Sequence, residues 1–555
     1  MRARPAAVSC RPTPWSAILK DESTPLEELL SRILAPEPVS RPTRLLPLGT
    51  MQGLNRRLAG RPWLDFLNAT LRGVGQVIFV NNPVSGLLIL VAMFIQSPWL
   101  GLMSLVGTAA ATLTAMAMRL APPKIQNGIF GLNGLLVGAA MGFFGNFGNG
   151  AWNPVWVVAV ILLSALATVV MHTLGTWFAV RLKVPPLGVA TNSVLLVFLI
   201  FVVFAPRTFF DLGPPPPAFP SGAVDGLRLL ESLPAGIGQV FFSDKLVPLL
   251  LIIVAIGICT PIGLAVGLLG CAMYLLAGLL LGARPDELYL GLWGYNAVLT
   301  ATAIGGVFYA PNRRSISLGA LCALFASMSS IVMARWLSPM RLPVLSVPFM
   351  VVTLGIFSLL RRSIPSLVPV ALHAVASPEE HWRRYVAARD ILTHFRRQLR
   401  AALLGEPRGL LFEAASPAIK RDLRRAFDAM DPDHSGGLST AELAAVLEGA
   451  GTSEGELNYL FACMDRDASA SIEFEEFGEL MLRQRRLMSR YEEFVTYFLP
   501  IDADEDQIIS IKEMNAAMRS VGEPSLTGDE IELLQRRAGG RPMTWNRFVE
   551  VLLVT

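Results

Sequence analysis

The sequence predicts an all-α membrane protein of two inverted five-span repeats with re-entrant or broken segments, followed by a soluble helical domain. Three observations support this fold class. Of the 555 residues, 53% are hydrophobic and only 16% are charged, whereas soluble domains carry about 25% charged residues. Apolar stretches of roughly 18 to 25 residues, long enough to cross a hydrocarbon core of ~30 Å, recur between positions 72 and 360. Two motifs within this region also occur twice with one common offset.

Ten apolar stretches give five spans in each half of the membrane region. We expect them at about 74–95, 98–118, 128–147, 154–180 and 184–205, and again at about 237–257, 260–282, 289–311, 316–336 and 342–360. The chain then divides into a disordered cytoplasmic tail (1–60), a first membrane repeat (61–205), an extracytoplasmic linker (206–235), a second membrane repeat (236–362), a basic amphipathic helical linker (363–415) and a C-terminal helical domain (416–555).

Basic residues in the short loops predict the orientation. With the N-terminus in the cytoplasm, Arg119, Lys124, Arg181, Arg313 and Arg361 all fall inside, as the positive-inside rule requires. The even number of spans returns the C-terminus to the cytoplasm. We expect a multi-pass protein of the plasma membrane rather than of an internal membrane. The net charge of +4 is small and gives no case for a nucleic-acid partner.

The membrane region repeats itself. The segment from Gly73 to Val77 recurs at Gly236, and the pattern G-x2-G-x-N-x2-L-x5-G that begins at Gly128 recurs at Gly291, both with an offset of 163 residues. A third pair, 184–189 against 342–347, has an offset of 158. Because each half has an odd number of spans, the halves lie inverted, and such repeats usually place a permeation site at their interface. The competing interpretation is that the glycines only let helices pack closely.

The membrane region carries few groups for ion coupling. Coupled transport usually requires buried carboxylates or histidines, which are costly in lipid. The only candidates are His172, which we interpret as a packing residue, and Asp244, which fits the interface or the interior equally well. A neutral polar solute that moves down its gradient fits better. No convergent nucleophile, base or catalytic metal site is evident, so we expect no enzyme.

The repeated motifs resemble signatures of the urea transporter family. Segment 72–86 (RGVGQVIFVNNPVSG) is close to the first-half signature of that family, and Gly291 to Asn296 with Ala303 to Gly306 resembles the second-half signature. Leu342 to Phe349 resembles the family segment LPxxTxPF. The resemblance covers about residues 60–360. It implies a homotrimer in the lipid bilayer, with one pore in each subunit that passes urea by facilitated diffusion.

The family pattern also implies which residues line the pore. Flat apolar walls would hold the faces of urea, and oxygens along one edge would accept hydrogen bonds from its NH2 groups. Ser346 stands where the family usually has a pore-lining Thr, and Leu136 and Leu299 would narrow the slot. Asn133 and Asn296 are interpreted as helix caps rather than solute ligands. The implied mouth residues are Gln76, Val77 and Phe79 at one end and Gln239, Val240 and Phe242 at the other.

Two departures from the family pattern affect selectivity. Gly188, the first-half counterpart of Ser346, has no side-chain oxygen, unless Thr191 or a backbone carbonyl substitutes for it. Residues 243–248 (SDKLVP) also replace an Asp-Asn-Pro-x-x-Gly type segment. A channel for short amides, water or ammonia, and an ion-coupled solute transporter, therefore stay as alternatives.

Three EF-hand loops follow in the C-terminal region, so the soluble domain is predicted to be an EF-hand domain that binds calcium. Each has oxygen-bearing residues at EF-hand spacing and a closing Glu that can bind calcium through both oxygens. Phe427, Phe461 and Phe498 each precede a loop by four residues. The expected ligands are Asp431, Asp433, Ser435, Gly437, Ser439 and Glu442 in the first loop, Asp465, Asp467, Ser469, Ser471, Glu473 and Glu476 in the second, and Asp502, Asp504, Asp506, Ile508, Ser510 and Glu513 in the third.

The loops are not equivalent. The sixth position needs a sharp turn that glycine favours, but the second loop has Ala470 there and the third has Gln507, so we expect weaker calcium binding in both. Segment 536–547 resembles a fourth loop without its acids, which we expect to pair with the third. Two lobes are expected, at about 418–485 and 490–555.

A basic amphipathic helix is expected at about 379–405, between the membrane region and the calcium loops. An apolar stripe that includes Trp382, Phe395 and Leu399 lies among six arginines, which include Arg396 and Arg400. Such helices dock on membrane surfaces or bind to EF-hand lobes. The two alternatives are membrane docking and an intramolecular contact with the chain's own EF-hand lobe. In the second case, calcium would bias the pore through this helix.

Overall fold

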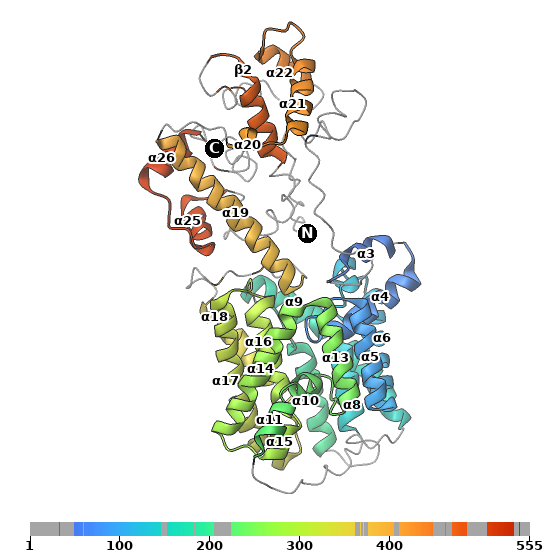
Figure 1. Cartoon of the computed structure of the whole chain (residues 1–555). Coiled ribbons are helices and arrows are strands. Elements are labelled where there is room, and N and C mark those ends of the chain that lie inside the picture. The colour runs from blue at the N-terminus through green and yellow to red at the C-terminus, as the bar shows by residue number, and fades with distance from the viewer. Residues whose placement is uncertain are drawn as a thin grey trace. The chain divides into compact units, whose positions relative to one another are not determined.

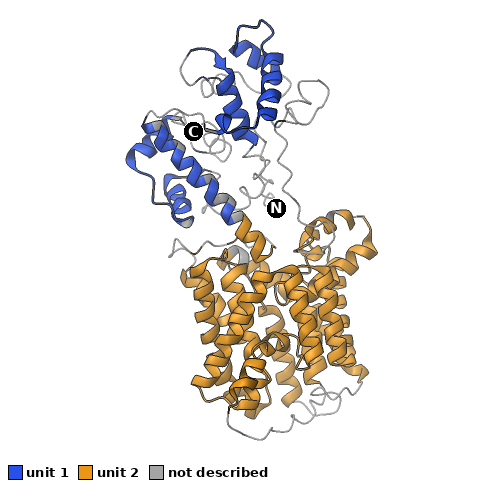
Figure 2. Ribbon diagram, viewed as in Figure 1, with its two compact units in different colours: residues 1–44, 384–555 blue, residues 45–383 orange. Residues whose placement is uncertain are grey.

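The chain folds into two units of packed helices (Figure 2). One unit comprises residues 45–383, and the other comprises residues 1–44 and 384–555. The computed structural model describes residues 49–58, 60–145, 153–182, 184–204, 224–360, 376–404, 410–447, 469–485 and 508–537, and single residues at 33, 367, 370, 461, 465 and 543. Of the extracytoplasmic linker expected at 206–235, residues 206–223 lie outside the described residues and residues 224–235 are described.

The first half of the unit 45–383 is a series of helices that often begin at proline. Proline fits the first turn of a helix because its missing N–H would have no partner there, and Asn82, Ser97 and Asn153 cap three of these helices. The elements are α3 (Gln52–Leu58), α4 (Pro62–Gln76), α5 (Pro83–Gln96), α6 (Pro98–Ala117), α7 (Pro122–Gln126), α8 (Gly131–Phe144), α9 (Pro154–Trp177), the π-helix η1 (Phe178–Leu182) and α10 (Val189–Phe204) (Figure 1).

The second half repeats this order. Its elements are α11 (Gly226–Glu231), α12 (Ala235–Gln239), α13 (Leu246–Cys259), α14 (Pro261–Leu280), α15 (Pro285–Tyr289), α16 (Gly294–Thr302), the π-helix η2 (Ala303–Val307), α17 (Arg313–Leu337), the 3-10 helix η3 (Ser338–Met340) and α18 (Val347–Leu360). Across the described residues, four helical segments (98–117, 154–177, 261–280 and 313–340) are long and apolar enough to cross a membrane, and five apolar helices are shorter. The predicted membrane fold with broken segments is confirmed.

Two of the expected spans are interrupted at equivalent places. In the first half α4 ends at Gln76 and α5 begins at Pro83, and in the second half α12 ends at Gln239 and α13 begins at Leu246. Hydropathy alone did not locate the start of these breaks, because their first residues, 77–80 and 240–242, are all apolar. Each break contains a signature residue in a left-handed conformation, Phe79 (φ 61°) and Phe242 (φ 54°).

The backbone confirms the internal repeat. The left-handed pairs Phe79 and Phe242, Leu187 and Leu345, and Gly128 and Gly291 fall at equivalent positions of the two halves. The equivalent helices α5 and α13 pack against each other, and the Ser85 hydroxyl donates to the Ala255 carbonyl at 2.6 Å. A Cβ on Gly73 would lie 2.9 Å from Gly131 Cα, so these motif glycines do serve close helix packing.

The segment just before the first repeat is ordered, although the tail was expected to be disordered up to residue 60. Helix α3 spans Gln52–Leu58, and the buried Arg72 guanidinium on α4 (0% exposed) binds the carbonyls of Thr50 and Met51. A buried cation needs such oxygen partners, and they fix this segment against the repeat. Of the expected tail before residue 49, the structure describes only Ile33, which is helical and buried.

The unit that contains residues 384–555 has two apolar clusters. It includes most of α19 (Pro378–Leu403), which begins in the other unit, and α20 (Leu410–Glu413), α21 (Pro417–Met430), β1 (Gly437–Leu438), α22 (Thr440–Leu447), β2 (Ile472–Glu473), α25 (Ile511–Ser520) and α26 (Gly528–Arg537). Strands β1 and β2 pair antiparallel and join the first two calcium loops. One cluster surrounds Phe427 and Phe477, and the other surrounds Phe395 and Met518.

The sixth positions of the first two loops have the same backbone conformation but different residues. Gly436 has φ 84° and Ala470 has φ 65°, and left-handed backbone costs a residue with a Cβ about 1 kcal/mol or more. We expect Ala470→Gly to stabilise its loop against local opening by about 1 kcal/mol. Hydrogen–deuterium exchange around β2, in full-length protein with a calcium chelator, would slow accordingly.

Gly436→Ala is the matched control for this prediction. No atom lies within 4 Å of a Cβ placed there, so the change adds only backbone strain, and exchange around β1 is expected to accelerate by a similar factor. Equal exchange rates in all three proteins would contradict the account.

Candidate functional site

A cavity of about 1070 Å³ lies in the unit 45–383. Both repeats contribute to its wall, because the interrupted helices of one half face those of the other. All nine residues that the sequence predicts for the pore border it: Gln76, Val77, Phe79, Leu136, Gln239, Val240, Phe242, Leu299 and Ser346.

Two glutamines occupy equivalent positions in the cavity wall. The Gln76 amide donates to the Asn127 carbonyl, and the Gln239 amide donates to the Leu290 carbonyl, each at 2.9 Å. Both acceptors directly precede a left-handed motif glycine. The hydrogen bond fixes each side chain in the same orientation and satisfies a carbonyl that a broken helix leaves open.

Aromatic rings from opposite halves meet at two places in the cavity wall. Phe79 makes edge contacts with Phe308 at 5.8 Å and Phe349 at 6.4 Å between ring centroids. Phe242 stacks on Phe143 at 4.9 Å. Each signature phenylalanine therefore packs against the other repeat. With Leu136 and Leu299, these rings form an apolar wall that suits a flat solute.

Ser346 faces the first repeat near the middle of the cavity. Its hydroxyl oxygen accepts a hydrogen bond from the Asn192 amide at 2.7 Å, and its main-chain N–H donates to Asn192 Oδ1 at 3.0 Å. The Thr191 hydroxyl instead donates to Asn133 Oδ1 at 2.7 Å. The sequence reasoning missed Asn192, although its place one helical turn after Gly188 was the available signal.

The two motif asparagines make internal hydrogen bonds. Asn296 accepts from the Phe349 N–H in the first turn of α18 and donates to the Leu345 carbonyl, so it caps another helix rather than its own. Asn133 accepts from Thr191, as described above.

The ionisable candidates for coupling lie at exposed positions. Asp244 is exposed and accepts from the Gln96 amide at 2.6 Å. His172 borders the cavity but is also exposed, so its interpretation as a packing residue is wrong; the neighbouring Met171 takes the buried face of α9. Among the described residues that line the cavity there is no Asp or Glu.

The first calcium loop has the geometry of a cation site. Carboxylate oxygens of Asp431, Asp433 and Glu442 lie within 4.8 Å of one another. The N–H groups of Ser435 and Gly436 donate to Asp431 at 3.0 and 2.9 Å, and Ser439 donates to Glu442. These bonds hold several hard oxygens around one point, the donor set that calcium prefers.

The second and third loops are described in part. Asp465 accepts from the N–H groups of Ser469 and Ala470, both at 2.9 Å, and Glu476 accepts from the Glu473 N–H. In the third loop the Ser510 N–H donates to Glu513 at 2.9 Å, and the Ile509 N–H donates to the Met543 carbonyl at 2.7 Å. The last bond pairs the third loop with the acid-free fourth segment. Asp467, Asp502, Asp504 and Asp506 lie outside the described residues.

Helix α19 packs against the lobe formed by α25 and α26. Leu392, Phe395 and Leu399 are buried in one cluster with residues such as Met514, Met518 and Leu534. Trp382, at the start of the predicted apolar stripe, is exposed. The structure therefore places only the middle of the stripe in an EF-hand lobe.

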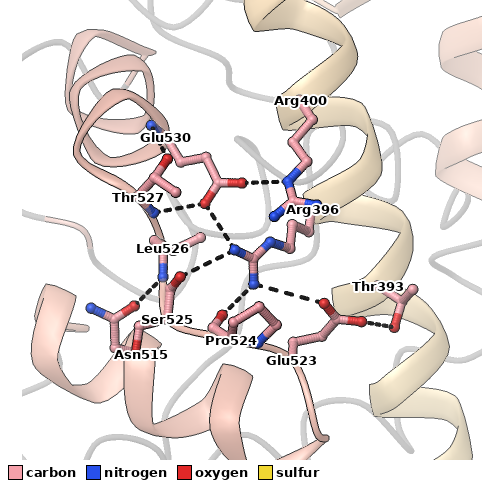
Figure 3. Close-up of polar contacts among 10 residues, drawn as sticks. All are labelled: Thr393, Arg396, Arg400, Asn515, Glu523, Pro524, Ser525, Leu526, Thr527 and Glu530. Atoms are coloured by element: carbon pink, nitrogen blue, oxygen red, sulfur yellow. Dashed lines mark hydrogen bonds and ion pairs between the residues drawn. The ribbon is translucent and has the colours of Figure 1, made fainter.

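An ion-pair network surrounds this contact (Figure 3). Arg396, one of the six arginines around the predicted apolar stripe, is 3% exposed and binds Glu530 (3.2 Å) and the carbonyls of Pro524 and Ser525. Arg400 also binds Glu530, at 2.9 Å. Burial opposes ionisation of Glu530, but the Thr527 N–H and the two arginines outweigh it and lower its pKa. Glu530 therefore stays ionised, and keeps its ion pairs with Arg396 and Arg400, at a lower pH than an ordinary glutamate would.

Helix α19 begins with contacts inside the membrane unit. Glu379 accepts hydrogen bonds from Thr260 Oγ1 (3.0 Å) and from the Ile262 N–H (2.6 Å), at the start of α14. The Pro378 ring lies against Gly306 of η2, where a Cβ would come within 3.1 Å of it. One continuous helix thus carries defined contacts within each of the two units.

Comparisons with known proteins agree with the repeated motifs. A family model described as "Urea transporter" matches residues 67–361, and one described as "EF-hand domain pair" matches residues 420–482. The mouse protein "Urea transporter 1" is 32% identical over 324 residues, which cover 57% of this chain and 83% of the mouse protein. The sheep protein of the same name is 32% identical over 340 residues, which cover 60% of this chain and 87% of the sheep protein.

The matched region contains both halves of the repeat and the whole cavity wall up to Phe349, and the EF-hand match contains the first two calcium loops. Relatives at this identity and coverage establish common ancestry of the membrane unit. The chain is an integral membrane protein of the urea transporter family, with EF-hands in its C-terminal region.

Proposed function

We propose that this protein is a passive channel-type transporter that lets urea diffuse down its gradient through the cavity between its two repeats. The observation that carries the proposal is the cavity wall, which combines aromatic and aliphatic side chains with the amides of Gln76 and Gln239 and the hydroxyl of Ser346. Urea is flat, neutral and strongly dipolar. Apolar walls hold its faces, and a few oxygens replace part of its lost hydration.

The absence of a hydroxyl at Gly188 favours a second candidate solute class, short amides. A channel with one hydroxyl at its middle offers urea fewer hydrogen bonds than a channel with two. Stopped-flow permeabilities for urea, acetamide, water and ammonia separate these functions. Accumulation of urea driven by a proton or ion gradient would contradict passive transport.

The family resemblance and the basic loop residues support two further parts of the proposal. We propose a homotrimer with one pore in each subunit, and a plasma-membrane protein with both termini in the cytoplasm. Native mass spectrometry in detergent and protease protection in sealed vesicles test these two points separately.

Ser346→Ala is expected to lower urea flux in proteoliposomes about five-fold, the factor that one neutral hydrogen bond is typically worth. Assembly should stay intact because the hydroxyl faces the cavity. Ser164→Ala is the matched control, since Ser164 is fully buried on α9 away from the cavity lining. Unchanged urea flux in Ser346→Ala would remove Ser346 from the mechanism.

We also propose that cytosolic calcium regulates the pore. The first loop supplies the ligands Asp431, Asp433 and Glu442, and the lobe that contains the third loop holds α19. The opening of an EF-hand lobe changes its apolar surface, and α19 joins such a lobe to contacts beside η2. The sign of the effect on flux is left to the experiment.

In full-length protein, we expect micromolar calcium to change the urea flux. In protein cut after residue 365, the urea flux should be the same with and without calcium. Glu442→Gln, which removes the closing ligand of the first loop, should reduce the calcium response. Asp428→Asn, an exposed acid on α21 outside the loop, is the matched control. Equal calcium responses in the full-length and truncated proteins would reject regulation through this domain.

A further inference from the structure

The two repeats meet asymmetrically at the middle of the cavity. Gly188 and Ser346 occupy equivalent positions, and a Cβ on Gly188 would lie 3.2 Å from Ser346 Oγ. One helical turn further, the first repeat has Asn192 and the second has Met350. The hydroxyl of Ser346, the carboxamide of Asn192 and the thioether of Met350 therefore lie together. Exact two-fold symmetry between the repeats would instead place identical side chains at equivalent positions.

Asn192 bridges the repeats with its side chain. Its Nδ2 donates to the Gly188 carbonyl and to Ser346 Oγ, both at 2.7 Å, and its Oδ1 accepts from the Ser346 N–H at 3.0 Å. The side chain is 5% exposed and borders the cavity. Together with a contact from Nδ2 to Met350 Sδ at 3.5 Å, these hydrogen bonds fix the position of the amide and leave it little freedom to rotate.

This carboxamide occupies the place of the side chain that Gly188 lacks. A Cβ on Gly188 would lie 2.9 Å from Asn192 Nδ2, which is too close for unstrained contact. The backbone does not explain the glycine, because Gly188 is not among the positive-φ residues. Asn192, and not a special turn, occupies the space into which a side chain at position 188 would extend.

Asn192 also decides what the Ser346 hydroxyl offers to a solute. A serine hydroxyl has one donor hydrogen and two acceptor lone pairs. The Asn192 amide occupies one lone pair, and the described contacts of Ser346 include no acceptor for its hydrogen. The hydroxyl hydrogen is thereby directed to the cavity, where a carbonyl oxygen of a solute can accept it.

We infer that Asn192 is a positioning residue that sets solute selectivity: it holds Ser346 as a hydrogen-bond donor, so that the middle of the pore recognises the carbonyl oxygen of urea and of other amides. The inference rests on the proposed transport of urea. It concerns the choice between solutes and not whether the pore conducts.

The test compares urea with thiourea, whose sulfur is a weaker hydrogen-bond acceptor than oxygen. Permeabilities are measured by stopped flow in proteoliposomes of the full-length protein. Asn192→Ala is expected to lower the urea-to-thiourea permeability ratio about five-fold, because one directed hydrogen bond is lost. A purely structural role would lower both permeabilities together and leave the ratio unchanged, which would overturn the inference.

A double substitution at positions 188 and 192 tests whether these two residues compete for the same space. Gly188→Ser alone should displace the Asn192 amide and lower the ratio, whereas Gly188→Ser combined with Asn192→Ala provides room for a second hydroxyl. The double variant should recover the ratio to within about two-fold of wild type, since one polar partner of Ser346 replaces another. A double variant as impaired as Asn192→Ala, or more so, would contradict the proposal.

Two controls separate the possible failures. Asn192→Asp has the same shape but accepts where the amide donates, so it should lower the ratio even if Asn192→Ala does not assemble. In a Ser346→Ala background, Asn192→Ala should change the ratio no further, because the two residues act as one unit. Wild-type protein without urea permeability above empty liposomes would sink the proposed function itself, whereas normal urea flux with an unchanged ratio in Asn192→Asp would sink only this inference.

Discussion

The hydrocarbon core of a membrane accepts no hydrogen bonds, and this constraint governs the membrane unit. Non-helical backbone at membrane depth must be buried in protein or must border an aqueous cavity. The chain interrupts its helices after Gln76 and after Gln239, and both glutamine side chains bind main-chain carbonyls of the same half. Arg72 binds the Thr50 carbonyl and, inside the first break, the Asn81 carbonyl. Breaks that would be untenable in lipid are thus satisfied from within, and they create the surface around the cavity.

Much of the architecture of the membrane unit could be predicted from the sequence because its two halves contain the same motifs. Identical offsets between motifs predicted the repeat, and the left-handed pairs, such as Gly128 and Gly291, show that equal sequence produced equal backbone. Hydropathy could not predict where the helix before each break ends, since the residues that follow directly, 77–80 and 240–242, are all apolar. The order of residues 49–58 was also missed, because Thr50 and Met51 are fixed by Arg72 from a later helix, and no local pattern records such a contact.

The candidate site shows the same division. The family resemblance could predict nine residues that border the cavity, because the signatures are local runs of sequence. Asn192 was missed because its role depends on a residue 154 positions later. Likewise, Arg396 was one of several arginines around the apolar stripe, and nothing near it in the sequence indicates that it is buried. It is buried because it pairs with Glu530, which lies 134 residues later in the chain. Contacts between segments that are far apart in the chain could not be predicted from local sequence patterns.

The left-handed backbone at Phe79 and Phe242 has a consequence for how the cavity discriminates. A phenylalanine in this conformation is held there by surrounding structure at an energetic cost, and each ring also packs against the opposite repeat. These ring contacts restrict rotation of each side chain about χ1. Each ring is thereby fixed in the cavity wall by residues of both halves of the chain, so the shape of the wall at these two places depends on how the repeats pack together.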